Sequence, residues 1–264
     1  GLRSFNPIMP EEVNRKMTDH ISNWLFCPTL TSVTNLANEG IKNGVFHCGD
    51  VMYDAARHYA GLNSSDVMNR LNLSKGDFVL VTVHRQENAD SPERLTGILE
   101  GLNRLAQMGL KIVWPLHPRM NDMPACKKLD KAWLFLPPLP FLDMQHLLRQ
   151  ARAVLTDSGG LQKEAYFHGT PCITLREETE WTETVTSGWN QLAGWHPSRI
   201  VECFHSLRQG GNIEEYGSGQ AADKIISYLT RALELKASAS NLSMAHHKAN
   251  FPSIQKKVEL VNHI

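Results

Sequence analysis

The chain has 264 residues, of which 42% are hydrophobic and 20% are charged, so a globular protein with one large domain or two small ones is expected. Its 27 basic side chains balance 27 acidic ones, which excludes a net field for nucleic acid or an anionic membrane, so an anionic ligand must be bound locally. No apolar run approaches the ~20 residues of a membrane helix and no signal-peptide core opens the chain, so we expect a cytoplasmic protein.

The five cysteines are odd in number, scattered and never paired as Cys-x-x-Cys. This spacing argues against a disulfide framework and against a zinc site, and no metal site is predicted. We expect buried thiols, because free cysteine is usually a core residue. The cysteines are Cys27, Cys48, Cys126, Cys172 and Cys203.

The first sixty residues are expected to form three helices and one strand. Apolar residues at helical spacing after Pro10 predict an amphipathic helix over residues 11–25. A second helix is expected at about 30–39 and a short strand at 45–47. Gly49 and Asp50 then predict a tight turn and an N-cap for a helix that ends near residue 62.

From residue 78 onward, apolar strands alternate with amphipathic helices. The predicted strands are 78–83, 111–116, 134–136, 153–156 and 172–175, and the predicted helices are 92–108, 120–128, 141–150, 160–168 and 221–235. Residues 209–220 are typical of a loop, and the tail is poorly patterned until residues 254–261. The alternation predicts an α/β fold with a parallel, doubly wound sheet, in which ligands bind beyond the carboxyl ends of the strands.

The most specific polar segment, residues 157–160 (DSGG), follows strand 153–156. Gly159 and Gly160 allow backbone amides to approach a phosphate, the Ser158 hydroxyl adds a donor, and the start of the next helix adds partial positive charge. Glu164 lies about one helical turn further on, where its carboxylate can accept both hydroxyls of a ribose. An ordinary capped turn with a solvated Glu164 explains this spacing about equally well.

Polar residues follow two other predicted strands. His84, Arg85 and Glu87 come directly after strand 78–83, and His117 follows strand 111–116. An imidazole can exchange protons or bind a phosphate near neutral pH. A single histidine after a strand is more often structural, but the repetition favours a functional role for both.

Two further charged segments are ambiguous by themselves. Arg176 and Trp181 lie among several glutamates after strand 172–175, a composition typical of a solvated loop. The position of this segment, one βα unit after the DSGG segment, favours the rim of a ligand site. Glu11 lies in the first turn of a predicted helix, where carboxylates usually complement the helix dipole.

Six segments in this order resemble the non-hydrolysing UDP-N-acetylglucosamine 2-epimerase family: GLRSFNPIMPEEVNR, GDVMYDA, VTVHRQEN, PLHP, LTDSGGLQKEA and LREETE. The resemblance implies a GT-B-like fold with two Rossmann-like domains that face each other across a cleft. Residues 1–52 then correspond to a remnant of the N-terminal domain, 53–240 to the UDP-binding C-terminal domain and 241–264 to a C-terminal tail or helix.

The resemblance implies interconversion of UDP-N-acetylglucosamine and UDP-N-acetylmannosamine, in the setting of cell-envelope polysaccharide biosynthesis. The implied reaction is anti elimination of UDP to a 2-acetamidoglucal, followed by re-addition with the opposite configuration at C2. It requires no redox cofactor. The implied partners are a UDP-sugar substrate and a second copy of the chain in a homodimer.

Carried over position by position, the resemblance implies that Glu11 and His84 are catalytic. The substrate-binding residues that it implies are Ser158, Gly159, Gly160, Glu164 and Arg176. Arg85, Glu87 and His117 match residues that, in some bacterial members, bind a second UDP-N-acetylglucosamine as an allosteric activator.

The sequence departs from the family pattern in three ways. Trp181 stands where the family has an arginine, and Met144 aligns with an aromatic residue expected near the uracil, so a modified substrate such as UDP-2,3-diacetamido-glucuronic acid is one alternative. The family's segment before GLR, with further catalytic acids, has no counterpart, which leaves a non-catalytic UDP-binding module as a second alternative. A GT-B glycosyltransferase is a third.

Overall fold

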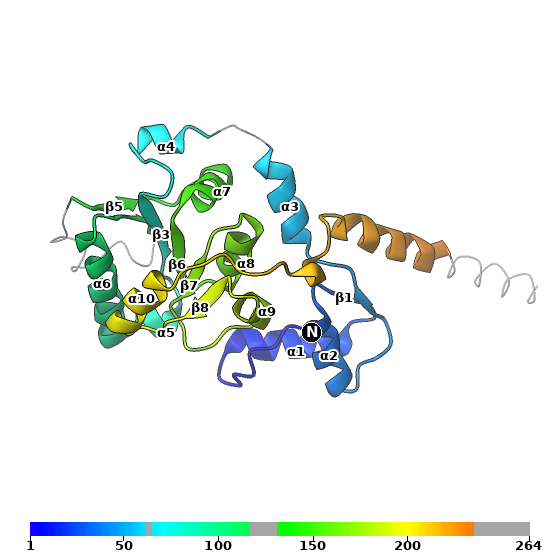
Figure 1. Ribbon diagram of the computed structural model, residues 1–264. Coiled ribbons are helices and arrows are strands. Elements are labelled where there is room, and N and C mark those ends of the chain that lie inside the picture. The colour runs from blue at the N-terminus through cyan, green and yellow to red at the C-terminus, as the bar shows by residue number, and fades with distance from the viewer. Residues whose placement is uncertain (62–64, 117–130, 235–264) are drawn as a thin grey trace, which may run out of the picture. The chain divides into compact units, whose positions relative to one another are not determined.

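The computed structural model describes residues 1–61, 65–116 and 131–234 (Figure 1). The chain divides into two compact units, Gly1–Gln220 and Ala221–Ile264, and the described part of the second unit is a helix over residues 221–234. The predicted helix at 120–128 and the segment 254–261 lie outside the described residues, as do His117 and Cys126.

The first unit contains the predicted strands and helices that fall within its described residues, together with several short elements that the sequence pattern does not predict. The helices are α1 (Pro10–Ile21), α2 (Leu30–Asn38), α3 (Val51–Ala60), α4 (Val67–Arg70), α5 (Gln86–Ala89), α6 (Pro92–Gln107), α7 (Phe141–Gln150), α8 (Gly159–Phe167), α9 (Thr182–Thr186), α10 (Pro197–His205) and the 3-10 helix η3 (Glu214–Tyr216). The strands are β1 (Leu25–Cys27), β2 (Val45–His47), β3 (Phe78–Thr82), β4 (Lys111–Pro115), β5 (Trp133–Leu136), β6 (Ala153–Thr156), β7 (Cys172–Thr174) and β8 (Asn190–Leu192).

Six strands form one parallel sheet in the order β5-β4-β3-β6-β7-β8. The chain runs outward from β3 to β5, returns to the other side of β3 and then runs outward from β6 to β8. The direction of winding therefore reverses between β3 and β6, and this switch point is where doubly wound sheets leave a crevice for ligands. The predicted parallel, doubly wound sheet is confirmed.

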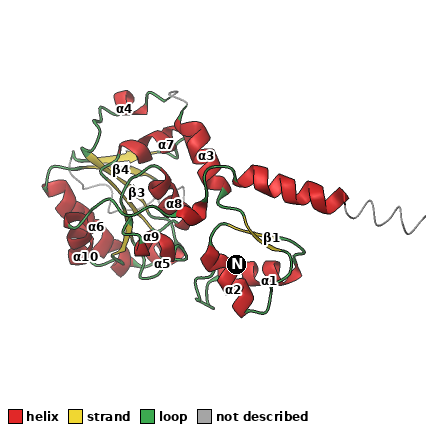
Figure 2. Ribbon diagram, turned by 45° about the vertical axis from the view of Figure 1, so that its right-hand side comes forward, coloured by secondary structure: helices red, strands yellow, loops and turns green. Residues whose placement is uncertain are grey.

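Helices cover both faces of this sheet (Figure 2). Val79 and Val81 of β3 belong to a buried cluster with side chains of α6 and α10, whereas Phe78 and Leu80 of the same strand belong to a cluster with α7 and α8. The alternation follows from the two-residue period of a strand. Because both faces of the sheet are buried, polar residues that could bind a ligand lie at the ends of the strands.

The prediction that the first helix runs to residue 25 is wrong. The helix ends at Ile21, Ser22 adopts an extended conformation, and Leu25–Cys27 form β1, which pairs in parallel with β2. Leu25 and Cys27 are buried in a cluster with Leu36 of α2. Burial and strand pairing outweigh the local helical periodicity, which is a weak preference by comparison.

The four cysteines in the described part of the chain are buried thiols, as predicted. Burial raises the pKa of the Cys27 thiol to about 11 and that of Cys172 to about 12. These thiols are therefore protonated and unreactive at neutral pH.

Gly97 of α6 lies against the backbone of Trp195, and we expect Gly97→Ala to destabilise the fold. A Cβ at residue 97 would lie 2.4 Å from the Trp195 carbonyl oxygen, which cannot rotate away. Overpacking of about 1–3 kcal/mol outweighs the gain of about 1 kcal/mol in helix propensity. Urea denaturation measures the difference. In Gly61→Ala the nearest atom is 3.7 Å away, so this control should match the wild type. Equal stability of the two variants would contradict the packing argument.

His168 makes the stability of the fold depend on pH. Its Nε2 lies 2.6 Å from Oε1 of Gln145, and burial, with a smaller contribution from Arg149, lowers its pKa to about 4. Because the unfolded chain binds the proton near pH 6.5, this contribution is complete above pH 6.5 and is lost as pH falls toward 4. At pH 5 the loss is about 2 kcal/mol.

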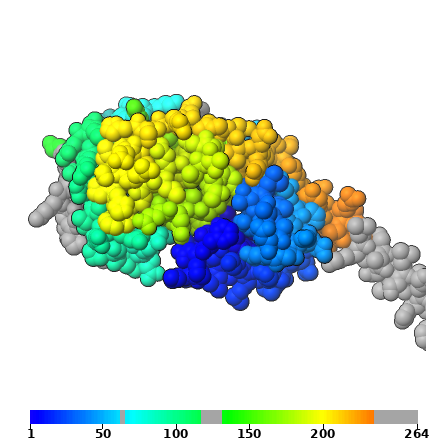
Figure 3. Space-filling view, turned by 60° about the horizontal axis from the view of Figure 1, so that its bottom comes forward, coloured from blue at the N-terminus to red at the C-terminus, as the bar shows by residue number. Residues whose placement is uncertain are grey.

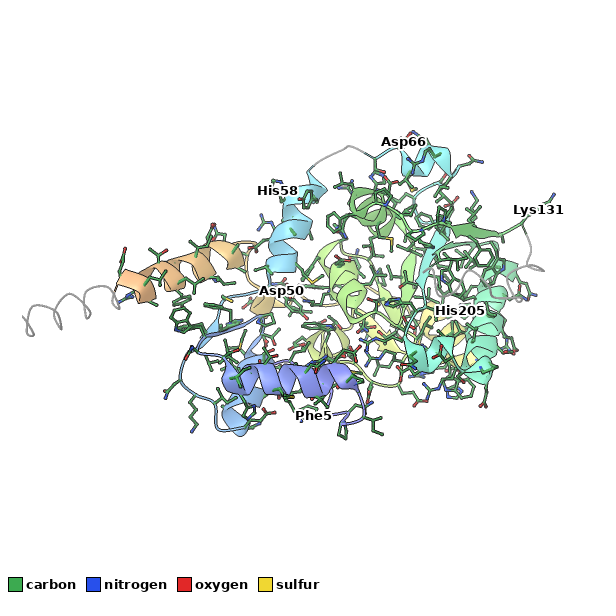
Figure 4. The ribbon with its side chains drawn as sticks, turned by 180° about the vertical axis from the view of Figure 1, so that it is seen from behind. Phe5, Asp50, His58, Asp66, Lys131 and His205 are labelled. Carbon is green, nitrogen blue, oxygen red and sulfur yellow. The ribbon has the colours of Figure 1, made fainter. Side chains whose placement is uncertain are left out.

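Urea denaturation at pH 7 and pH 5 tests this dependence. His168→Gln should remove most of the difference between the two pH values, whereas His205→Gln, at an exposed position on α10, should retain it (Figure 4). A wild-type difference that survives in His168→Gln would show that another group causes it.

Candidate functional site

Two cavities meet at the switch point between β3 and β6. The charged cavity, of about 530 Å³, is lined by Glu11, Arg15, His84, Arg85, Glu180 and Trp181 among others. The second, of about 630 Å³, contains more apolar groups and is lined by residues that include Met52, Leu116, Leu161 and Glu164; we call it the apolar cavity. His84, Ser158 and Gly160 line both. A larger cavity, of about 810 Å³, is lined by none of the predicted site residues.

The N-terminus of α8 opens onto both cavities. Ser158 is the N-cap residue, but its side chain makes no capping hydrogen bond, and its backbone N–H donates to Oγ1 of Thr156 at 2.9 Å. The first N–H groups of a helix have no acceptor within the helix. Together with the helix dipole, they form a site suited to a phosphate.

The two glycines of this turn have different surroundings. A Cβ on Gly159 would lie 3.1 Å from Nε1 of Trp181 and 3.6 Å from Oε2 of Glu180, so no side chain fits without displacing its neighbours. A Cβ on Gly160 would meet its nearest atom, Cε of Met52, at 3.8 Å. A Cβ at residue 160 would therefore cause no close contact, and Gly160 lines both cavities.

The first turn of α1 is fixed by Glu12, the neighbour of the predicted catalytic Glu11. The buried Glu12 carboxylate accepts hydrogen bonds from the backbone N–H of Ser4 at 2.8 Å and of Phe5 at 3.3 Å, and it pairs with Arg15 at 3.1 Å. These contacts hold the preceding loop against the helix. Glu11, more than half exposed, is left to line the charged cavity, with Oε1 3.7 Å from Nη1 of Arg85.

Two guanidinium groups meet one buried carboxylate in the charged cavity. Oε1 of Glu180 lies 3.7 Å from Nη2 of Arg15 and 3.9 Å from Nη2 of Arg85. Burial raises the pKa of Glu180, but the charge and hydrogen bond of Arg176 and the charge of Arg85 outweigh it, so the net pKa is below its usual range. Figure 3 shows the N-terminal segment in dark blue next to a yellow-green part of the surface, and the distance between Arg15 and Glu180 gives a contact between the N-terminal segment and the segment after β7.

Arg176 lies behind this cavity and lines neither of the two. It is 2% exposed, its Nη1 donates to Oε2 of Glu180 at 2.9 Å, and its Nε is 3.5 Å from Glu87. The structure therefore brings Arg176 and Glu87 together, and Glu180 connects Arg176 to the charged cavity.

Glu164 lines the apolar cavity from α8. Burial raises the pKa of its carboxyl above the usual range, and this effect exceeds the opposing influence of Gln145 and Lys163. Met144, which aligns with an aromatic position of the family, packs against the core cluster under α7 and α8.

Several polar residues that build the site have no role in it that the sequence predicts, although Asp50 is the N-cap of α3, as predicted. Asp157 and Asn88 hold the turn after β3, Arg15 and Glu180 line the charged cavity, and Lys163 pairs with Asp50 at 2.5 Å. Each lies within or beside a segment that was singled out, but its partner is remote in sequence. The sequence signal that could have pointed to these residues is their position within or next to a recognised segment.

A family model described as UDP-N-acetylglucosamine 2-epimerase matches residues 1–230. The chain belongs to this family. A UDP-N-acetylglucosamine 2-epimerase homolog from Methanococcus maripaludis is 43% identical over 245 residues, which cover 87% of this chain and 66% of the relative. A UDP-2,3-diacetamido-2,3-dideoxy-D-glucuronate 2-epimerase from Pseudomonas aeruginosa is 43% identical over 240 residues, which cover 88% of this chain and 66% of the relative.

A solved member of the UDP-N-acetylglucosamine 2-epimerase family has the same fold. The enzyme from Methanocaldococcus jannaschii, in complex with UDP-N-acetylglucosamine and UDP, superimposes with a TM-score of 0.80 at 36% identity, over 88% of this chain and 67% of that one. The family and its α/β, GT-B-like fold class, predicted from six segments, are thereby confirmed. The chain spans about two thirds of the length of these relatives.

The described residues contain no helix that is long and apolar enough to cross a membrane. In the same part of the chain, no group of three or more His, Cys, Asp or Glu side chains is arranged to hold a metal ion.

Proposed function

We propose that the chain binds UDP-sugars at the switch point of the sheet and takes part in the C2 epimerisation of UDP-N-acetylglucosamine to UDP-N-acetylmannosamine. The observation that carries the proposal is the open N-terminus of α8, where Ser158, Gly159 and Gly160 face a cavity bordered by His84. The diphosphate of UDP matches such a site in charge and size. The solved relative from M. jannaschii contains UDP-N-acetylglucosamine and UDP.

The proposed reaction is an elimination followed by an addition. A base removes the proton from C2, the electron pair forms the C1–C2 double bond, and the bond between C1 and the β-phosphate oxygen breaks to release UDP. Return of a proton to the opposite face of C2 and of UDP to C1 gives the epimer, so no net oxidation or reduction occurs. His84 and the amides at Ser158–Gly160 stabilise the departing diphosphate, and Glu11 exchanges protons with the sugar.

Ser158→Ala and Glu164→Ala are expected to weaken UDP binding by about 1–3 kcal/mol each, because each removes one partner of a polar contact with the ligand. Ser158 contributes a donor to the diphosphate and Glu164 an acceptor for the ribose hydroxyls. Titration calorimetry with UDP measures both. Ser198→Ala, at an exposed position on α10, is the matched control. Unchanged affinity in both site variants would remove the nucleotide assignment.

Deuterium exchange tests the reaction itself. In heavy water, an epimerase introduces deuterium at C2 of UDP-N-acetylglucosamine, because the C2 proton leaves in each catalytic cycle. UDP binding without exchange would support the alternative of a non-catalytic UDP-binding module. Sugar transfer to an acceptor with the C2 label retained would support a glycosyltransferase. Absence of UDP binding would contradict all three.

A second candidate substrate is UDP-2,3-diacetamido-2,3-dideoxy-D-glucuronate. Nη2 of Arg15 and Nη2 of Arg85 lie 3.7 and 3.9 Å from the Glu180 carboxylate, beyond hydrogen-bond distance, so these two nitrogens can donate to the carboxylate of a uronic acid. The relative from P. aeruginosa is named for this substrate. Comparison of C2 exchange in the two nucleotide sugars decides between them.

Other features carried over from the resemblance remain proposals. We propose the domain boundaries 1–52, 53–240 and 241–264, a homodimer and a cytoplasmic location. Arg85, Glu87 and His117 are proposed to hold an activating second nucleotide sugar. Arg85 lines the charged cavity, Glu87 faces Arg176, and His117 lies outside the described residues. Light scattering in solution tests the dimer.

Arg176 is proposed to contribute to the rim of the ligand site through its contact with Glu180. The guanidinium fixes the carboxylate that faces Arg15 and Arg85. It therefore sets where those two cations lie in the charged cavity.

A further inference from the structure

A buried carboxylate lies directly beneath the proposed diphosphate site. Asp157, between β6 and α8, is 0% exposed. Its Oδ2 accepts hydrogen bonds from the backbone N–H of His84 at 3.1 Å and of Arg85 at 2.9 Å, and its Oδ1 lies 3.2 Å from the same N–H of His84. The carboxylate therefore holds the backbone at the start of the turn that follows β3.

Asn88 extends this contact to a third strand. Its side chain is 1% exposed, and Nδ2 donates to Oδ2 of Asp157 at 3.2 Å and to the carbonyl oxygen of Leu175 at 2.9 Å. Leu175 directly follows β7. The carboxyl ends of β3, β6 and β7 are thus joined by one buried polar cluster around the switch point.

The placement of this charge requires an explanation. A buried carboxylate is costly unless it is hydrogen-bonded, and a negative charge beside a diphosphate site also repels the ligand. Within the described residues, the basic side chain recorded within 4 Å of Asp157 is the imidazole of His84, with Nδ1 3.6 Å from Oδ1. Both the backbone and the ring of His84 are therefore close to this carboxylate.

We propose that Asp157, supported by Asn88, is the positioning residue for His84. It fixes the turn between β3 and α5 so that the imidazole borders Ser158 and Gly160, where His84 lines both cavities. The hydrogen bonds of the carboxylate preorganise the ring before the ligand arrives, so that binding does not have to order it. This inference rests on the proposed function, because it assigns a supporting residue to the same UDP site.

A double-mutant cycle of UDP binding tests the inference. Calorimetry compares the wild type, Asp157→Asn, His84→Ala and the double variant. Each single substitution is expected to weaken UDP binding about tenfold, and the double variant should bind within about twofold of His84→Ala. The reason is that Asp157 acts on the ligand through a ring that is already absent.

A second cycle is the matched control. Glu164 lines the apolar cavity from α8 and has no hydrogen bond to Asp157. Asp157→Asn should therefore cause the same loss of about tenfold in the Glu164→Ala background as in the wild type. General loosening of the fold would reduce affinity equally in both backgrounds, so independent losses in both cycles would overturn the inference.

Each remaining outcome also supports or contradicts the inference or the proposed function. If Asp157→Asn does not fold, as judged by circular dichroism, Asn88→Ala replaces it in both cycles with the same expectations. If His84→Ala binds UDP as tightly as the wild type does, the His84 ring makes no contact with the ligand that Asp157 could support, and the inference is wrong. If the wild type does not bind UDP, the proposed function fails. If the wild type binds UDP but the first cycle is additive, the inference alone fails.

Discussion

Replacement of Lys163 by methionine is expected to lower the free energy of unfolding by about 3–5 kcal/mol, because it leaves a buried charge without its partner. Lys163 of α8 is 5% exposed and Asp50 is 4% exposed, and Nζ lies 2.5 Å from Oδ2. The ammonium also lies 3.9 Å from the centroid of the Trp181 ring. Asp50, labelled in Figure 4, is the N-cap residue of α3, and its Oδ1 accepts a hydrogen bond from the N–H of Met52.

The double variant separates the two roles of Asp50. Asp50→Asn keeps a capping oxygen but removes the charge, so Lys163→Met combined with Asp50→Asn should recover most of the lost stability. Urea denaturation measures all variants, with Lys75→Met, at an exposed position, as the control. If Lys163→Met is as stable as Lys75→Met, the ion pair does not stabilise the fold.

The second large effect is expected on ligand binding. Gly159→Ala should weaken UDP binding by about 10- to 100-fold, because overpacking costs about 1–3 kcal/mol where neighbours cannot yield. The new Cβ would lie 3.1 Å from Nε1 of Trp181, whose ring is held by Lys163. The displaced turn would then no longer present its amides to the diphosphate.

Gly211→Ala is the control for this substitution. Residue 211 has no positive φ, and the nearest atom to a Cβ there, the Ser187 carbonyl oxygen, is 3.9 Å away. Titration calorimetry should show wild-type UDP affinity for this variant. Wild-type affinity in Gly159→Ala as well would show that the close approach at Gly159 has no part in ligand binding.

The alternation of strands and helices from β3 to β7 could be predicted from the sequence because most of these elements have their own hydrophobic period. The bounds of β6 and α7 agree with the prediction to the residue. The sequence does not predict strand β8, because Asn190–Leu192 has no apolar alternation. Asn190 is buried although it is polar, and its Oδ1 accepts a hydrogen bond from the Thr174 hydroxyl at 2.8 Å. The end of α1 was misplaced because β1 exists only by pairing with β2.

In the candidate site too, features that are local in sequence could be predicted and contacts between distant segments could not. Ser158–Gly160 could be singled out as a candidate because the residues of such a turn are continuous in sequence, and His84 because it follows an apolar strand. The supporting contacts could not, because their partners are far apart: 113 positions separate Asp50 from Lys163. Spacing in one sequence does not reveal such pairs, and the residues that hold His84 and Glu180 in place became visible through the fold.

The central claim is that UDP binds across the switch point, with its diphosphate at the N-terminus of α8. The most direct test is a titration of this chain with UDP, monitored by the backbone amide signals in nuclear magnetic resonance spectra. We expect saturable shifts that are largest at Ser158, Gly159, Gly160 and His84, with small shifts on the far side of the sheet at α10. Saturable binding that leaves these four amides unshifted, or no binding at millimolar UDP, would contradict the claim.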